Sequence, residues 1–149
     1  MKLRITMPTA VVAQLDDVVH VRAEDASGAF GILRGHADFL TVLEASVVSW
    51  RRAGGAEGHC AVRGGVLMVS GGERIAIATR DAVLGDDLLH LESEVLGAFR
   101  RKSAEERTAR AGSARLQLAA MRRIFDYLRP EREARRRPPL GLRAGRSST

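Results

Sequence analysis

Cysteine is nearly absent from this 149-residue chain, in which Cys60 is the only one. A single cysteine excludes an internal disulfide framework and a zinc site with four cysteine ligands, and it fits a reducing compartment. The sequence also has no long apolar run and no basic N-terminal segment followed by a hydrophobic signal core. We therefore expect any membrane association to come through another protein.

Motifs that carry catalysis are also lacking. The sequence has no phosphate-binding Gly-x-x-x-x-Gly-Lys-Ser/Thr loop, no Gly-x-Ser-x-Gly elbow, no His-Glu-x-x-His and no Cys-x-x-Cys. The four histidines are isolated and have no metal-ligand spacing; they are His20, His36, His59 and His90. We expect a protein that is not an enzyme and that binds neither a metal nor a cofactor.

Charge divides the chain into two unequal parts. The residues before Phe99 carry nine Lys or Arg and thirteen Asp or Glu, whereas those after it carry fifteen and five, a net charge of +10. A basic half usually meets an acidic protein surface, nucleic acid or membrane headgroups. Aromatic residues are few, with one Trp, one Tyr and four Phe, which disfavours a surface that stacks bases. A nucleic-acid-binding module and a free-standing scaffold protein remain alternatives.

The first 84 residues show the alternation and turn signals of an antiparallel β-sandwich. Leu3 and Ile5 alternate with polar residues, and glycine pairs such as Gly64-Gly65 and Gly71-Gly72 separate short β-rich runs. From Asp86 the spacing becomes helical, and Asp86 or Asp87 can cap the first turn.

Residues 85–129 are expected to form an antiparallel helical hairpin. Gly112-Ser113 separates two amphipathic segments, and the second carries a stripe that includes Leu118, Met121 and Phe125. Ser103 either starts a new helix with Glu106 or lies within one long helix. Residues 130–149 are expected to be a disordered basic tail, either solvated or in contact with an anionic membrane. The predicted class is therefore α+β.

One segment of the sandwich is especially rich in glycine. It reads Gly28-Ala29-Phe30-Gly31-Ile32-Leu33-Arg34-Gly35-His36-Ala37-Asp38-Phe39-Leu40-Thr41-Val42-Leu43. We expect its glycines to provide positive φ or close chain approach and its apolar residues, Leu33, Leu40 and Val42 among them, to be buried. A glycine corner of any β-sandwich would account for the segment alone.

The segment resembles the signature loop of the epsilon subunit of the F-type ATP synthase, which reads roughly Gly-Glu-x-Gly-Ile-x-Pro-Gly-His-Ala-Pro-x-x-Thr-x-Leu. Three positions depart from it: Ala29 replaces a common Glu, and Arg34 and Asp38 replace common prolines. The resemblance extends over positions 1 to 128. The Gly64–Val69 stretch is similar to a strand of that family, and the order of elements, a sandwich followed by helices, is also the family's order. The departures suggest a divergent branch, such as a sodium-linked complex.

The resemblance implies a non-catalytic subunit of the rotary central stalk, peripheral to the cytoplasmic face of a bacterial inner membrane. It implies that the sandwich binds the gamma subunit and the c-ring, and that the hairpin folds on the sandwich or extends to inhibit ATP hydrolysis. By position in the motif, the rotor contacts are Ala29, Phe30, Gly31, Arg34, Gly35 and His36.

The helical region has its own expected site. Its arginines are candidates for an electrostatic latch on the catalytic beta subunits, although a merely solvated basic face is an equal alternative; they are Arg107, Arg110, Arg115, Arg122 and Arg123. Some relatives bind ATP through an Ile/Leu-Asp-x-x-Arg-Ala motif at the first helix. The corresponding stretch, residues 89–94, lacks that Asp and Arg, so we expect no nucleotide site.

Overall fold

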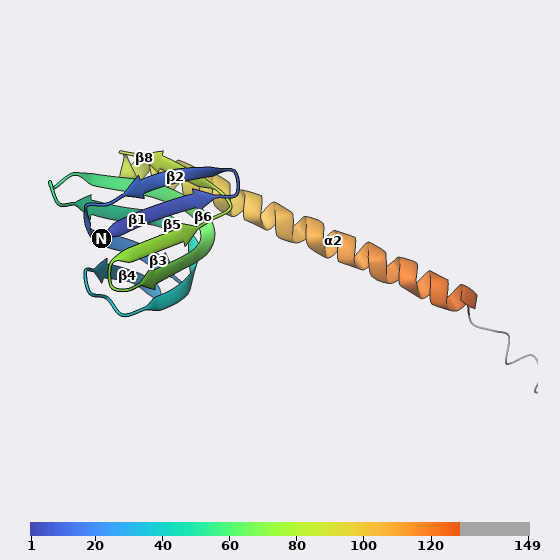
Figure 1. Ribbon diagram of the computed structural model, residues 1–149. Coiled ribbons are helices and arrows are strands. Elements are labelled where there is room, and N and C mark those ends of the chain that lie inside the picture. Colours follow the sequence, from blue (N-terminus) through green and yellow to red (C-terminus); the bar gives the residue numbers. More distant parts are fainter. Residues whose placement is uncertain (129–149) are drawn as a thin grey trace, which may run out of the picture. The chain divides into compact units, whose positions relative to one another are not determined.

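The computed structural model describes residues 1–128, and the expected tail at 130–149 lies outside the described residues. Eight strands precede the helical region (Figure 1). They are β1 (Lys2–Met7), β2 (Ala10–Leu15), β3 (Val18–Asp25), β4 (Gly28–Leu33), β5 (Phe39–Arg52), β6 (Glu57–Ser70), β7 (Arg74–Ala78) and β8 (Ala82–Gly85).

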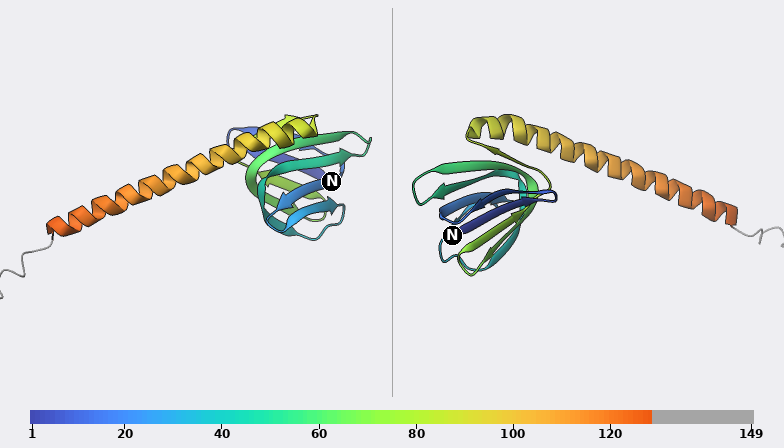
Figure 2. Two further views of the ribbon diagram at one scale, coloured as in Figure 1. Left: turned by 180° about the vertical axis from the view of Figure 1, so that it is seen from behind. Right: turned by 45° about the horizontal axis from the view of Figure 1, so that its top comes forward.

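The strands form a single hydrogen-bonded sheet that folds into two layers (Figures 1 and 2). The strand order is β2-β1-β7-β6-β5-β3-β4, and β8 pairs with β6. The long strands β5 and β6 belong to both layers: the second half of β6 pairs with β7, whereas its first half pairs with β8. The expected β-sandwich is therefore confirmed.

Alternation along the strands places the core between the layers. Leu3 and Ile5 of β1 are fully buried, and they lie in register with Ile75 and Ile77 of β7. The β1–β7 pair is parallel, while the other strand pairs are antiparallel. Period-two alternation is the same in both kinds of pair, so the sequence gives no sign of this exception to the expected antiparallel order.

The helical region begins as the sequence predicts. Asp87 is the N-cap of α1 (Leu88–His90), and its carboxylate accepts hydrogen bonds from the backbone N–H of Leu89 and His90. A π-helical turn, η1 (Leu91–Val95), follows and leads into α2 (Leu96–Leu128). The buried side chains Leu91, Leu96 and Phe99 pack on Ala61 of β6.

The expected hairpin is wrong, because α2 runs from Leu96 to Leu128 without a break. Gly112 and Ser113 lie inside the helix, and Gly112 does not have a positive φ. A glycine costs about 1 kcal/mol in a helix relative to alanine. The Ala, Leu and Arg residues on both sides are strong helix formers, so one Gly-Ser pair without a proline does not end the helix. Ser103 likewise lies within α2.

The chain divides into two compact units, Met1–Arg107 and Thr108–Thr149. The first contains the sandwich, α1, η1 and the first turns of α2. The first unit therefore does not end at residue 85, where the sandwich gives way to the helical region. It extends to Arg107, because the buried side chains of the first helical turns pack on β6.

Candidate functional site

The glycine-rich segment forms a corner together with a second turn of the sandwich. We call residues 34–38, between β4 and β5, the corner loop, and residues 71–73, between β6 and β7, the glycine turn. The backbone N–H of Gly35 donates to the carbonyl of Gly72 at 2.8 Å. Both glycines have positive φ, +83° and +66°, and a Cβ on Gly72 would lie 2.9 Å from Gly35 Cα. The two turns are therefore in direct backbone contact.

Two of the positions that depart from the family pattern bind this same turn. Arg34 Nη1 lies 2.8 Å from Glu73 Oε1, with both side chains exposed. Asp38 Oδ1 accepts a hydrogen bond from the backbone N–H of Gly71 at 2.8 Å. Proline fixes a loop through its own ring. Here side-chain bonds to the glycine turn hold the corner loop at those two positions.

The other predicted rotor-contact residues line β4 and the corner loop. Ala29 and Gly31 are exposed on β4, an edge strand. Phe30 packs edge-on against Phe39, with ring centroids 5.6 Å apart, and the His36 ring lies 5.8 Å from Phe39 on centroids. The six predicted residues thus follow one another along β4 and the corner loop, with Ala29 and Gly31 exposed and Phe30 partly buried against the core.

Gly31 serves close approach, which was one of the two roles expected of the segment's glycines. It has no positive φ, and a Cβ there would lie 3.0 Å from His20 Nε2 on the neighbouring strand β3. A side chain at position 31 would therefore displace the His20 ring.

An exposed apolar patch beside the corner loop was missed by the sequence reasoning. Its four residues form two cross-strand pairs between β5 and β6, Leu40 with Met68 and Val42 with Val66. Leu40 is 67% exposed and Val42 is 69% exposed. The expectation that Leu33, Leu40 and Val42 are buried is wrong, because they face outward while Ile32 and Leu43 face the core. A run in which both faces of a strand are apolar was the available signal.

A carboxylate network fixes the strand end next to this apolar patch. Asp25 accepts hydrogen bonds from the Ser27 hydroxyl and backbone N–H and from the Thr41 hydroxyl, which lies 2.7 Å away. These bonds, that from the Ser27 hydroxyl first, hold the pKa of Asp25 below its usual value. Thr41 lies between Leu40 and Val42, so the network fixes the backbone that presents them.

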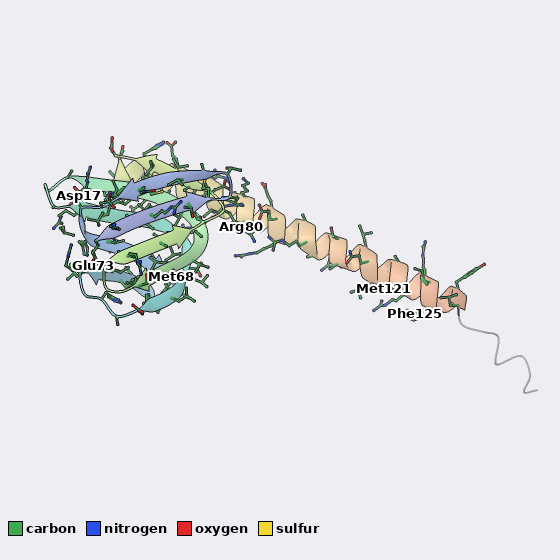
Figure 3. The ribbon with its side chains drawn as sticks, viewed as in Figure 1. Asp17, Met68, Glu73, Arg80, Met121 and Phe125 are labelled. Carbon is green, nitrogen blue, oxygen red and sulfur yellow. The ribbon has the colours of Figure 1, made fainter. Side chains whose placement is uncertain are left out.

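The predicted latch arginines all lie on α2 and are exposed. Arg107 belongs to the first compact unit and the other four to the second. The apolar stripe of the same helix is also exposed, with Met121 at 55% and Phe125 at 71% (Figure 3). The second unit therefore offers both charge and apolar surface to a partner.

Within residues 1–128, no cluster of His, Cys, Asp and Glu could hold a metal ion. In the same range, no helix is both long and apolar enough to cross a bilayer.

Comparison with known proteins gives consistent matches. The model of the ATP synthase delta/epsilon chain β-sandwich domain matches residues 1–85. A protein named ATP synthase epsilon chain 2 from Paraburkholderia xenovorans is 44% identical over 132 residues, which cover 89% of this chain and 95% of the relative. Another of that name, from Cereibacter sphaeroides, is 43% identical over 126 residues, or 85% of this chain and 86% of the relative.

A solved structure shares the fold. A chain in the cryo-EM structure of the Euglena gracilis mitochondrial ATP synthase, OSCP/F1/c-ring, superposes with a TM-score of 0.53 at 22% identity. The match covers 55% of this chain and 51% of that chain.

Proposed function

Because this chain belongs to the epsilon subunits of the ATP synthase, we propose that its sandwich couples the rotor by binding the gamma subunit and the c-ring. The family makes it a non-catalytic central-stalk subunit of a membrane-associated complex, as the sequence resemblance implied. That membership leaves the nucleic-acid-binding and scaffold alternatives without support. We further propose the cytoplasmic face of a bacterial inner membrane as its location.

The observation that carries this proposal is the apolar patch of Leu40, Val42, Val66 and Met68. Monomeric proteins rarely leave a contiguous apolar surface uncovered, and such patches mark interaction sites. Here the patch lies on hydrogen-bonded strands, so it is a rigid, preformed surface. We assign the gamma subunit to the apolar patch and to the adjoining corner loop with Arg34, Gly35 and His36. We assign the c-ring to the β4 edge with Ala29, Phe30 and Gly31.

Capture of the gamma subunit tests this assignment. Val42→Asp places a charge in the apolar patch, and we expect it to reduce co-purified gamma at least about tenfold, the equivalent of 1.4 kcal/mol. Val19→Asp is the matched control, because Val19 is also an exposed valine, 42% accessible, but lies on β3 outside the patch. Equal capture by both variants, each with an unchanged melting temperature, would contradict the assignment.

A second proposal concerns the regulatory role of the helix. We propose that the segment of α2 after Arg107, instead of a hairpin, inhibits ATP hydrolysis through its arginines. Arg115 and Arg122 are seven residues apart and therefore lie on the same side of the helix, next to the apolar stripe. Each exposed ion pair contributes only about 0.2–1 kcal/mol, so several must act together on acidic segments of the beta subunits.

The test replaces Arg115, Arg122 and Arg123 by alanine and measures ATP hydrolysis by the whole complex. We expect faster hydrolysis, most clearly at low salt, with ATP synthesis still coupled. Replacing the same three residues by lysine is the matched control, since it keeps the charge. Unchanged hydrolysis by the alanine variant across a salt series would leave the arginines as a solvated basic face.

A further inference from the structure

A nearly buried arginine connects the sandwich to α2. The Arg63 side chain on β6 is only 8% exposed. Its Nη1 donates a hydrogen bond to Glu106 Oε1 on α2 at 2.7 Å, and its Nε lies 2.9 Å from Asp81 Oδ2. One guanidinium therefore joins three segments of the first unit: β6, the chain between β7 and β8, and the third turn of α2.

The backbone fixes Asp81 without help from α2. The Arg63 N–H donates to the Asp81 carbonyl at 3.0 Å. Gly65, two residues further along β6, has a φ of +143°, and a Cβ there would collide with the Ala78 carbonyl. This close approach holds β6 against the end of β7. Arg63 and Asp81 therefore belong to the sandwich, whereas Glu106 belongs to the helix α2.

Glu106 is also the better-directed acceptor of the two. The Nε of Arg63 is fully buried and has no aligned hydrogen-bond acceptor despite its short distance to Asp81. A buried charge that loses a partner pays a large desolvation penalty, because water cannot replace the missing acceptor. Loss of Glu106 would thus leave Arg63 with one imperfect partner.

Two exposed cations also pair with these carboxylates. Lys102 Nζ lies 3.1 Å from Asp81 Oδ2, and Arg80 Nη1 lies 3.5 Å from Glu106 Oε2. Both carboxylates are therefore shared between the buried Arg63 and an exposed cation. Lys102 and Glu106 are four residues apart, so both ends of one helical turn are tied to the sandwich.

We propose that Arg63 is an anchor that fixes α2 to the sandwich as far as Glu106, so that any movable helical segment begins after that residue. The division of the chain between Arg107 and Thr108 falls immediately beyond the anchor. This proposal goes beyond the proposed function, because it names the residue that holds the helix and the position after which the helix can move. Only the consequence for regulation of ATP hydrolysis rests on the proposed function.

Hydrogen exchange of the isolated full chain, followed by mass spectrometry, tests the anchor. In the native chain, amides of residues 97–106 should exchange more slowly than those of residues 112–128. Glu106→Gln should accelerate exchange in residues 97–106 by about tenfold or more, because that segment opens locally. Glu105→Gln is the matched control: Glu105 is adjacent and exposed, and it forms no ion pair within the described range.

The double variant Arg63→Met with Glu106→Leu removes both charges. Replacing a whole buried pair by apolar groups is tolerated better than removing one partner. Its residues 97–106 should therefore exchange more slowly than those of Glu106→Gln. The inference is overturned if Glu106→Gln exchanges like the native chain, if both segments of the native chain exchange alike, or if the double variant gains no protection over the single one. ATP hydrolysis plays no part in this readout, so the anchor and the inhibitory role fail independently.

Discussion

The backbone N–H of Gly35 donates a 2.8 Å hydrogen bond to the carbonyl of Gly72, although these residues lie on different connections of the sandwich. The contact joins the corner loop to the glycine turn. Arg34 with Glu73 and Asp38 with Gly71 add side-chain contacts on either side of it. The shape of the proposed rotor-binding corner is therefore set by two segments more than thirty residues apart in sequence.

Gly72→Ala should destabilise the chain by roughly 1–3 kcal/mol, because Gly72 combines a positive φ with a 2.9 Å approach to Gly35. Thermal unfolding measures this. Gly54→Ala is the matched control, since Gly54 lies in a turn, has no positive φ and would place its Cβ in open space. Equal melting temperatures for the two variants would contradict the close contact.

Gly31→Val should destabilise the sandwich by crowding rather than by backbone strain. The added side chain meets the tip of the His20 ring, which must shift from its preferred rotamer, a change that costs about 0.5–1.5 kcal/mol. Combining it with His20→Ala should recover part of that stability, because the ring that gives way is removed. If the stability loss of the double variant equals the sum of the losses of the two single variants, His20 is not the group that the new valine crowds against.

A fragment ending at residue 87 should fold, because the main core is built from residues that precede the helices. It should nevertheless be less stable than a fragment ending at Arg107 by roughly 1–3 kcal/mol, because it lacks the burial of Leu91, Leu96 and Phe99 on Ala61. Denaturant unfolding of both fragments decides this. A non-cooperative transition of the shorter one would show that the helical turns complete the core.

The Asp25 network should make stability depend on pH in the acid range. The pKa of Asp25 is lowered in the folded chain, so its contribution is present above the ordinary aspartate pKa of about 3.9 and is lost as pH falls through the lowered value. Asp25→Asn should therefore lower the melting temperature at pH 7 and have a smaller effect near pH 2.5. A deficit of equal size at both values would exclude ionisation of Asp25 as the cause.

Cys60 should be unreactive in the folded chain. Burial raises the pKa of its thiol to about 11, and its side chain is inaccessible. An aromatic disulfide reagent at pH 8 should label it only after denaturant is added. Rapid labelling of the native chain would show that β6 separates from one of its neighbours there, β5 or β8.

The expected sandwich and its core were accessible from sequence because alternation states which residues face inward. Leu3, Ile5, Leu67 and Val69 follow that rule closely. The Asp87 cap was equally readable, since capping is local chemistry. The continuity of α2 was not readable, because Gly112 and Ser113 are permissive for a turn but do not impose one.

The outward orientation of Leu40 and Val42 also escaped sequence reasoning. Both alternate positions of that strand are apolar, and the choice between them depends on which side the other layer covers. The roles of Arg34 and Asp38 depend on their contacts with the glycine turn. No local sequence pattern predicts that this turn lies beside the corner loop.

The sequence by itself determined the family, the β-sandwich and the start of the helical region, because periodicity, capping and the glycine signature act over short stretches of chain. The tertiary structure alone decided the contact of the corner loop with the glycine turn, the apolar patch on β5 and β6, and the burial of Arg63 between Asp81 and Glu106. Each of these brings together residues distant in sequence, and their energies depend on distance and solvent exclusion, which exist only once the layers have packed.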